Sequence, residues 1–301
     1  NIKQKDEFGV FEVGMDRIGE IDFLSKIIMP DVAVITNISY AHAKNFKSIN
    51  EIAKAKSEII YNVNKNGSIV LNADDPFYSK HKAIALNRKI KVLSFSISKK
   101  NTNVYIEKIV KKINKFEIFI NINDKKYSFL VKSIFESNLK NILAAVAVIS
   151  IFKDIDELNQ NVFYNFKIPT GRGDISEVKV NKKIIKFIDE SYNANPLSVS
   201  SAIKNFDLIK NGKSKKNIIL GDMLELGKHS KKLHEDLAYV INESKIDNVH
   251  VYGNSIKHTF KKIKKRKKGL FLKDKKQIIN LIKNNINNND YLMIKGSNLT
   301  G

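Results

Sequence analysis

Short apolar runs alternate with helix-like segments throughout the second half of the chain, and this alternation limits the folds that are available. Each apolar run has the length of a buried strand, and each is separated from the next by a segment of helical periodicity. The expected strands are 184–188, 217–220, 249–252 and 291–294, and the expected helices are 196–210, 230–244 and 277–286. Because strands joined through helices run parallel, the pattern predicts a parallel, doubly wound sheet of the α/β class.

The first half predicts another α/β unit of mostly parallel strands, with one region of different texture. Its expected strands are 9–14, 32–35, 67–72 and 90–97, and its expected helices are 19–29, 49–60, 138–152 and 156–166. The region 104–131 alternates apolar and polar residues around a turn at Asn123-Asp124, which predicts a β-meander. The segment 169–174 contains a proline and two glycines, so we place a linker there and expect domains at 1–168 and 169–301.

Composition excludes several classes of protein. The 301 residues are 43% hydrophobic, enough for packed cores, and no apolar run approaches a membrane span or a signal peptide. Without cysteine the chain forms no disulfide or thiolate metal site, which agrees with a cytoplasmic location. The net charge of +22 comes from lysines scattered along the whole chain. The dense run 261–268 is interpreted as a solvated helix face, in preference to a nucleic-acid or lipid contact.

The stretch 31–60 combines a buried strand, a polar turn and a helix, and one lysine of the helix is out of place. Ser48 and Glu51 match the capping-box pattern and predict the start of that helix. Lys56 falls on the apolar stripe that should face the core. Either the stem of Lys56 snorkels past the core edge, or Lys56 is a functional group beside His42, and periodicity alone leaves both open.

Polar residues follow several expected strands at their carboxyl ends, where open α/β sheets bind ligands. Glu12 lies near the end of the first strand, and His42 lies in the turn after the second. A carboxylate and an imidazole there could coordinate a hard cation such as Mg²⁺ or Mn²⁺, but an ammonium cannot, so Lys56 would need modification or another role. The polar strand ends of the second half are 189–196, 221–227 and 295–297.

At these same residues the sequence resembles the Mur ligase family. The segments F-E-V-G, G-E-I, N-I-S-Y-A-H, F-K-S-I and A-K-S-E-I are similar to the central ATPase domain of that family. The later segments D-E-S-Y-N-A-N-P, G-D-M-L-E-L-G-K-H-S-K-K-L-H and K-G-S resemble the members that add D-alanyl-D-alanine. The resemblance spans nearly the whole chain in the right order and implies a central ATPase domain followed by a Rossmann-like C-terminal domain.

The resemblance implies an amide-forming ligase that uses ATP and Mg²⁺. The terminal carboxylate of a UDP-N-acetylmuramoyl-tripeptide would be phosphorylated to an acyl phosphate, which the amine of D-alanyl-D-alanine then attacks. The acyl phosphate turns a poor leaving group into a good one, and Mg²⁺ would neutralise charge on the transferring phosphoryl group. The resemblance further implies a cytoplasmic monomer that takes part in peptidoglycan precursor synthesis, without nucleic acid or membrane insertion.

The resemblance also implies roles for individual residues. Three match the catalytic and metal-binding positions: Glu12, His42 and Lys56, the last as a carbamate. Four match positions that contact adenine, phosphate or ribose: Asn72, Arg172, Asp189 and Glu190. Six match positions that face the substrate cleft: Asn193, Asn195, Glu225, Ser230, His234 and Lys295.

The chain departs from the family pattern in three places. Asp189-Glu190-Ser191 stands where the family has Asp-Asp-Ser, which lengthens one acid by a methylene, and Phe135-Glu136-Ser137-Asn138 lacks the glycine and histidine of a G-x-H-N pattern. No G-x-x-x-x-G-K-[ST] phosphate-binding loop occurs. We therefore interpret the chain as a fragment that lacks the N-terminal domain and the phosphate-binding loop, and we expect it not to hydrolyse ATP as it stands.

Three other interpretations compete with this one. A folylpolyglutamate synthase-like ligase would share the ATPase core but not the substrate, and the E-L-G and Y-N-A-N-P segments argue against it. A degenerate, inactive homologue would keep the fold without the activity. A basic nucleic-acid-binding protein would bind DNA with a steep salt dependence, which the dispersed lysines disfavour.

Overall fold

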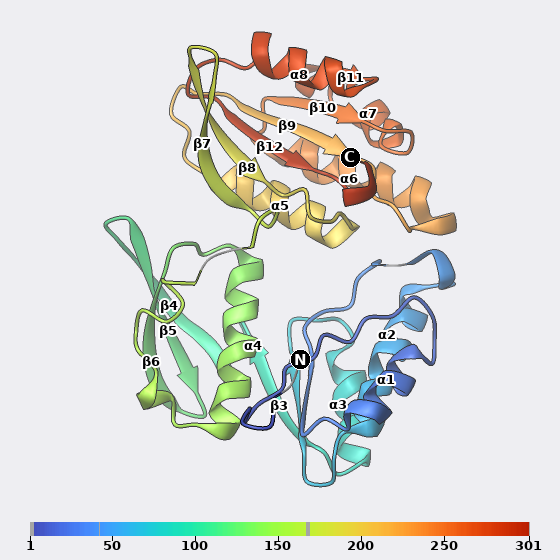
Figure 1. The fold of residues 1–301 in the computed structure, drawn as a ribbon, viewed down its shortest axis with the longest axis vertical. Helices are drawn as coiled ribbons and strands as arrows, with labels where there is room; N and C mark the ends of the chain where they lie inside the picture. The colour runs from blue at the N-terminus through green and yellow to red at the C-terminus, as the bar shows by residue number, and fades with distance from the viewer. Residues whose placement is uncertain (1–2, 42, 167–168, 301) are drawn as a thin grey trace.

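The computed structural model describes residues 3–41, 43–166 and 169–300, which form two six-stranded sheets, one in each predicted domain. Figure 1 shows the first sheet and its helices in the lower half of the molecule and the second sheet in the upper half. The boundary predicted between 168 and 169 lies at the end of the gap at 167–168, so the residue on its N-terminal side is outside the described residues. No helix among the described residues is long and apolar enough to cross a membrane.

The first sheet has the order β1-β2-β3-β4-β5-β6 and is parallel up to β4. Its strands are β1 (Val32–Ile35), β2 (Ser68–Asn72), β3 (Lys91–Ser96), β4 (Val104–Lys112), β5 (Lys115–Ile122) and β6 (Lys125–Val131). The last three are antiparallel, which confirms the predicted meander. The turn at Asn123 and Asp124 has φ of 46° and 70°, the left-handed conformation that asparagine and aspartate tolerate.

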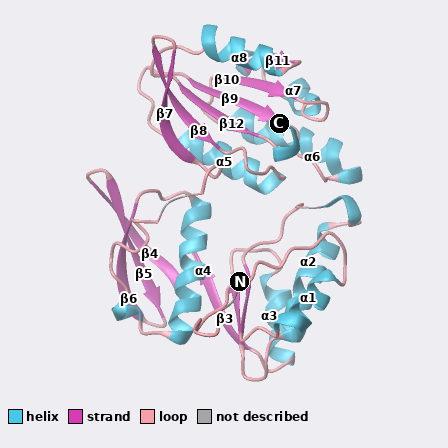
Figure 2. Cartoon of the chain, in the orientation of Figure 1, coloured by secondary structure: helices cyan, strands magenta, loops and turns pink. Residues whose placement is uncertain are grey.

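Strand β2 is buried on both faces, because helices cover both sides of the parallel part of this sheet. Ile69 and Leu71 join the core that holds the helices preceding β2, while Val70 points into a separate core with the long helix that follows the meander. The helices of this domain are α1 (Glu20–Ile28), α2 (Ile49–Ser57), α3 (Tyr78–Asn87) and α4 (Glu136–Phe152). Figure 2 shows α4 between the meander and the rest of the domain.

The second sheet has the order β11-β10-β9-β12-β8-β7, parallel except for β7, and it confirms the predicted doubly wound domain. Its strands are β7 (Asp174–Val180), β8 (Lys183–Asp189), β9 (Lys216–Gly221), β10 (Asn248–Tyr252), β11 (Lys268–Leu272) and β12 (Tyr291–Lys295). Its helices are α5 (Pro196–Leu208), α6 (Ser230–Glu243), α7 (Lys257–Lys262) and α8 (Lys275–Asn284). Successive residues of β9 point to opposite faces of the sheet. Ile218 packs with α5 and α6 on one face, and Ile219 packs with α8 on the other.

Several local predictions are wrong. The expected strand 9–14 is an unpaired coil in which Val10 is 99% exposed, since no described strand pairs with it. The expected helix 156–166 is reduced to a short 3₁₀ turn at Ile155–Glu157. The Ser48 side chain does not cap α2, although Glu51 does accept a hydrogen bond from the Lys47 amide at 2.7 Å.

The lysine-rich run 261–268 is not one solvated helix face. Helix α7 ends at Lys262, a 3₁₀ turn spans Lys265–Lys267, and Lys268 opens the edge strand β11. The Lys267 side chain is buried, and its Nζ donates to the carbonyls of Ser244 and Ile246. A buried ammonium needs such partners, so this lysine ties the end of α6 to the edge of the sheet.

Candidate functional site

Lys56 lies on α2 at the carboxyl end of β1 and is held by one peptide unit. Its Nζ donates to the Asn37 carbonyl at 3.0 Å, and the amide of the same peptide, at Ile38, donates to Asp75 Oδ2 at 2.6 Å. The carbonyl of the Asn37–Ile38 peptide is therefore bound by a cation, and its amide is bound by a carboxylate. Burial lowers the pKa of Lys56, and the charge of Asp75 opposes that shift. The Lys56 ammonium thus has a fixed carbonyl partner, which argues against the interpretation in which its stem only snorkels to water.

Asp75 and His81 lie near Lys56, and sequence reasoning did not select either as a site residue. Asp75 Oδ1 accepts a hydrogen bond from the Phe77 amide at 2.9 Å, so the turn after β2 fixes the orientation of its carboxylate. His81 Nε2 donates to the Ala53 carbonyl at 3.1 Å, which holds α3 against α2, and burial lowers the pKa of this imidazole. The position of Asp75 at a strand end was the only signal in the sequence that could have identified it.

The described residues do not assemble the predicted metal site. Glu12 is exposed on the unpaired segment before α1, and His42 lies outside the described residues. Lys56 carries its ammonium into a carbonyl contact and presents no ligand oxygen. In the part of the chain that the structure describes, no three carboxylate or imidazole side chains gather in a way that could hold a metal ion.

Asn72 has a structural connection at the end of β2. It is buried, its Nδ2 donates to the Thr36 carbonyl at 2.9 Å, and its Oδ1 accepts from the Asp74 amide at 2.9 Å. The amide group therefore joins the carboxyl ends of β1 and β2. Both of its polar atoms are engaged within the protein, so an adenine contact would have to share one of them.

Glu190 and Lys295 form the most buried ion pair among the described residues, at the carboxyl ends of β8 and β12. Lys295 Nζ lies 3.2 Å from Glu190 Oε2, and the lysine side chain is 2% exposed. The same Nζ donates to the carbonyl of Asn193 at 3.0 Å. Burial lowers the pKa of Lys295, whereas Glu190 acts in the opposite direction. The extra methylene of Glu190 thus carries its carboxylate to a buried cation.

The linker packs directly on this ion pair. The Gly173 amide donates to the Asp189 carbonyl at 2.7 Å, and an added Cβ on Gly173 would lie 2.7 Å from Glu190 Oε1. The Arg172 guanidinium lies over the exposed ring of Tyr192, 4.2 Å from its centroid. Asp189 Oδ1 accepts from the hydroxyl of Ser191 at 2.6 Å. The structure therefore brings together the predicted nucleotide-binding residues Arg172, Asp189 and Glu190.

The side-chain hydroxyl of Ser297 joins the three strand ends of the second domain. Ser297 Oγ accepts a hydrogen bond from the Leu224 amide at 2.9 Å and donates to the Ala194 carbonyl at 3.3 Å. Asn195 caps α5 through a complete capping box with Ser198. These contacts bring together the segments that sequence analysis selected after β8, β9 and β12, and they show that Asn195 serves first as a helix cap.

His234 was predicted to face the cleft, but the structure places it beneath the loop. Its side chain is fully buried, its Nε2 accepts from the Met223 amide at 3.1 Å, and its Nδ1 donates to the Ser230 carbonyl at 2.8 Å. Burial lowers the pKa of His234, which favours the neutral ring that these two contacts require. His234 and Ser230 therefore hold the loop that carries Glu225.

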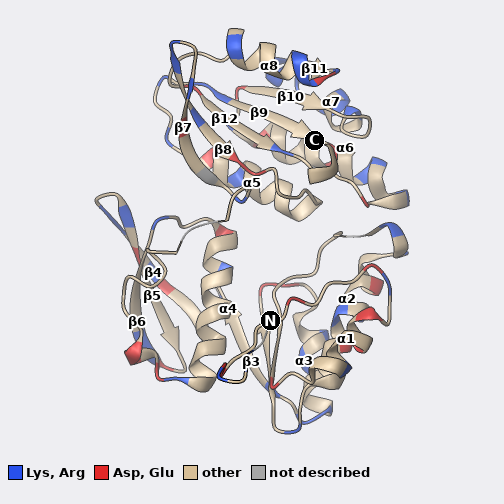
Figure 3. Ribbon diagram, viewed as in Figure 1, with Lys and Arg blue, Asp and Glu red and all other residues tan. Residues whose placement is uncertain are grey.

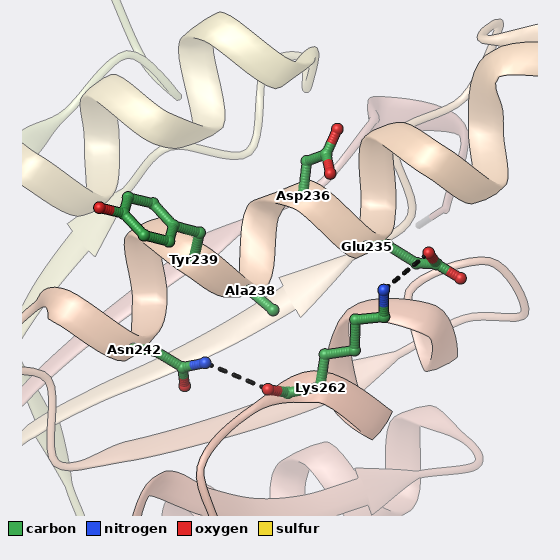
Figure 4. A pocket seen from close by; sticks show the side chains of 6 residues that line it. All are labelled: Glu235, Asp236, Ala238, Tyr239, Asn242 and Lys262. Carbon is green, nitrogen blue, oxygen red and sulfur yellow. Dashed lines mark hydrogen bonds and ion pairs between the residues drawn. The ribbon is translucent and has the colours of Figure 1, made fainter.

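One surface hollow lies between α6 and α7 (Figure 4). It is lined by Glu235, Asp236, Ala238, Tyr239, Asn242 and Lys262. Glu235 pairs with Lys262 at 2.9 Å across it, and Asn242 donates to the Lys262 carbonyl. It contains no predicted site residue. Figure 3 shows lysine and arginine spread over both domains instead of gathered at one face, as the sequence indicated.

Comparison with known proteins gives one family for both domains. The model of the Mur ligase middle domain matches residues 1–149, and that of the Mur ligase glutamate ligase domain matches residues 176–298. The UDP-N-acetylmuramoyl-tripeptide–D-alanyl-D-alanine ligase of Rickettsia prowazekii is 30% identical over 97% of this chain, and that of Buchnera aphidicola is 31% identical over 91%. The chain spans 64% and 62% of the length of these two relatives.

Solved structures show the same architecture. A MurF structure from Acinetobacter baumannii superposes with a TM-score of 0.83 over 99% of this chain and 64% of that chain, at 24% identity. MurF ligase from Thermotoga maritima in complex with ADP gives a TM-score of 0.79 over 95% of this chain and 62% of that chain, at 24% identity. At this identity the match shows the fold. The chain therefore belongs to the Mur ligase family, of which it carries the middle domain and the glutamate ligase domain.

Proposed function

We propose that this protein is an ATP-dependent ligase that adds D-alanyl-D-alanine to a UDP-N-acetylmuramoyl-tripeptide in peptidoglycan precursor synthesis. The observation that carries the proposal is its 30% identity, over 97% of its length, to a relative named for that reaction. The local geometry supports it, since each domain gathers polar strand-end residues around one lysine, the half-buried Lys56 in the first domain and the buried Lys295 in the second.

The proposed reaction has two steps. A carboxylate oxygen of the tripeptide attacks the γ-phosphorus of ATP, ADP leaves, and an acyl phosphate forms. The amine of D-alanyl-D-alanine then attacks the acyl carbon, phosphate leaves with the C–O bond electrons, and the amine loses a proton. In this proposal the exposed guanidinium of Arg172 attracts a phosphate group, and Asp189 accepts a hydrogen bond from a ribose hydroxyl; the contacts of Arg172 with Tyr192 and of Asp189 with Ser191 support these roles because they keep both side chains near the end of β8.

Mg²⁺ use and carbamylation of Lys56 belong to the proposal through the family resemblance. Burial lowers the pKa of Lys56, and the neutral amine that this favours is the form that reacts with carbon dioxide. The described residues do not by themselves form a cation site, and Mg²⁺ when bound would neutralise charge on the phosphoryl group. We further propose that the protein acts as a cytoplasmic monomer and does not bind nucleic acid.

The substrate assignment is tested by measuring ADP and phosphate release, both with this chain and with a chain extended upstream to the length of its relatives. We expect release by the extended chain only when the tripeptide nucleotide and D-alanyl-D-alanine are both present. Equal turnover with L-glutamate and a folate would assign the protein to the folylpolyglutamate type of ligase instead. No turnover by the extended chain with any of these acceptors would indicate an inactive homologue.

The role of Lys56 is tested by Lys56→Ala in the extended chain. We expect turnover to fall by more than about 100-fold, because a charged group at the reaction centre is lost, and we expect bicarbonate not to restore it. Lys54→Ala is the matched control, since Lys54 is an exposed lysine on the same helix. Turnover equal to that of the parent in Lys56→Ala would exclude a catalytic role for Lys56.

A further inference from the structure

A short segment of the first domain docks onto the motif loop of the second. The 3₁₀ turn Ala43–Asn45 follows β1, and the 3₁₀ turn Gly227–His229 precedes α6. The two turns contact each other, and in Figure 1 they face one another across the two domains at the right of the molecule. They lie far apart in the sequence, so their contact is a property of the tertiary structure.

Hydrogen bonds between described residues cross this junction. The Lys44 amide donates to the Glu225 carbonyl at 2.7 Å. His229 Nε2 lies 3.2 Å from the Phe46 carbonyl, and because a carbonyl only accepts, this ring nitrogen carries the proton. The Tyr40 ring packs beside the His229 ring at a centroid distance of 5.3 Å.

Gly227 fits this junction because it has no side chain. Its φ is +53°, and an added Cβ would lie 2.8 Å from Lys44 Cα and 3.1 Å from the Lys44 carbonyl oxygen. Both of those atoms are backbone, so they cannot swing aside as the end of a side chain would. Any other residue at 227 would push the two domains apart or distort one of the turns.

Apolar side chains seal the same junction. Ala43, Phe46 and Leu226 are each at most 3% exposed, and they belong to one core cluster that contains residues of both domains. Their burial removes apolar area from water at the place where the two turns meet. The junction is therefore a packed contact as well as a hydrogen-bonded one.

The segment that reaches this junction begins at a peptide held by Lys56. Its first peptide, Asn37–Ile38, is the one held between the Lys56 ammonium and the Asp75 carboxylate. Its far end, at Lys44 and Phe46, holds the loop that contains Glu225. One short stretch of backbone thus joins the lysine cluster of the first domain to the strand-end loops of the second.

We propose that Gly227 and His229 are positioning residues that form an interdomain latch with Lys44 and Phe46. The latch seats the loop 222–230 on the segment after β1, so that the strand ends of the two sheets act on one substrate. The functional consequence rests on the proposed ligase activity, whereas the latch itself is a structural claim that can be tested without any substrate.

The test compares Gly227→Ala with Gly212→Ala. Gly212 has nearly the same left-handed backbone, φ +56° against +53°, but nothing lies within 4 Å of its added Cβ, so it carries the strain without the clash. Because the chain has no cysteine, spin labels can be placed at Leu86→Cys on α3 and Ile279→Cys on α8, both exposed. Pulsed electron-spin measurements then report the distance distribution between the domains.

We expect one narrow distribution in the parent and in Gly212→Ala, and a shifted or broadened one in Gly227→Ala. An unchanged distribution in Gly227→Ala, with the fold retained by circular dichroism, would overturn the latch. If Gly227→Ala does not fold, His229→Ala gives the same reading, and His229→Gln, whose amide can still donate to Phe46, should restore the parent distribution. A parent-like distribution in His229→Ala would also overturn it.

The kinetic arm uses the extended chain. We expect Gly227→Ala to lower kcat by about 100-fold with a smaller change in the KM for ATP, because misplacement of the two halves of a site affects the reaction more than the binding to one half. Gly212→Ala should stay near the parent. A changed distance with unchanged kcat would refute the positioning role, and a changed distance in a protein without ligase activity would refute the proposed function but not the latch.

Discussion

Individual buried lysines explain much of the local order in this chain. Lys295, Lys267 and Lys216 are each almost inaccessible to water, and each gives its ammonium to backbone carbonyls at the ends of helices or strands. Burial lowers the pKa of all three. Such cations are stable only while their partners are complete, so the cost of removing one partner can be predicted.

Glu190→Gln should destabilise the second domain. In this variant Lys295 keeps its carbonyl partners but loses its only carboxylate contact in the described structure. The charge of Glu190 then no longer opposes the effect of burial, so the pKa of Lys295 falls further. We expect the free energy of unfolding to fall by about 3 kcal/mol, measured by urea denaturation at pH 7. Glu243→Gln, which alters an exposed pair with Lys264, is the control and should change it by less than about 1 kcal/mol. Equal values for the two variants would contradict the assignment.

At the scale of elements, edge strand β11 depends on one histidine of its neighbour. The His250 Nδ1 accepts a hydrogen bond from the Leu270 amide at 3.0 Å, and an added Cβ on Gly269 would touch the imidazole ring. Burial lowers the pKa of His250 to about 4. The pairing register of β10 and β11 shifts between Val249 and Val251, so this side chain supplies the contact at the irregularity.

The depressed pKa of His250 predicts acid sensitivity. The unfolded chain binds a proton near pH 6.5 and the folded chain only near pH 4, so stability is complete above pH 6.5 and is lost as the pH falls toward 4. This one group should remove about 2 kcal/mol between pH 7 and pH 5. His81 and His234, whose pKa values are also lowered by burial, act in the same direction.

Urea denaturation at pH 7 and pH 5 checks this prediction in the parent and in His250→Gln. The variant cannot titrate at this position, so it should lose less stability on acidification than the parent does. A lower protection factor of the Leu270 amide against hydrogen exchange, in the parent at pH 5 relative to pH 7, would locate the change in β11. An identical pH dependence in the two proteins would show that His250 does not titrate as its burial requires.

For the whole molecule, the contacts between the two domains decide which groups can act together. The junction of Lys44 with Gly227 is one such contact, and Phe135 at the start of α4 is another. Phe135 lines a small apolar cavity with Ile188, Phe206 and Met293 of the second domain. At the position where the family pattern has a polar turn, this chain therefore has an apolar contact between domains.

An engineered disulfide provides a direct check of the domain arrangement. A side chain at residue 227 crowds Lys44, but an added Cβ there lies 3.3 Å from Lys44 Cβ. This distance is slightly below the roughly 3.8 Å typical of a disulfide, so a bond between two cysteines would hold the turns together against that crowding. We expect Lys44→Cys with Gly227→Cys to cross-link under mild oxidation, which non-reducing electrophoresis detects, since the chain has no other cysteine. Lys44→Cys with Tyr239→Cys, about 14 Å further along α6, should not cross-link. Equal cross-linking of both pairs would contradict the arrangement.

Most of the fold follows from local pattern. Buried strands such as β2 and β9 were predicted because their apolar residues are consecutive in the chain, and the meander was predicted from its alternation and its turn. Hydrophobic periodicity is a local property, so it survives without knowledge of distant partners. The same locality explains the failure at 9–14, where an apolar run without a pairing strand remains a coil.

The candidate site also shows a difference between what sequence predicts and what only the structure reveals. Motif resemblance selected Lys56, Arg172, Glu190 and Lys295, but only packing between distant segments revealed what each one contacts. Asp75 reaches Lys56 through a peptide of another loop, and Gly227 meets Lys44 from the other domain. Hydrogen bonds and close backbone approaches join residues far apart in sequence. A linear pattern can therefore indicate which residue types are present, while their partners, burial and pKa values depend on how the chain is folded in space.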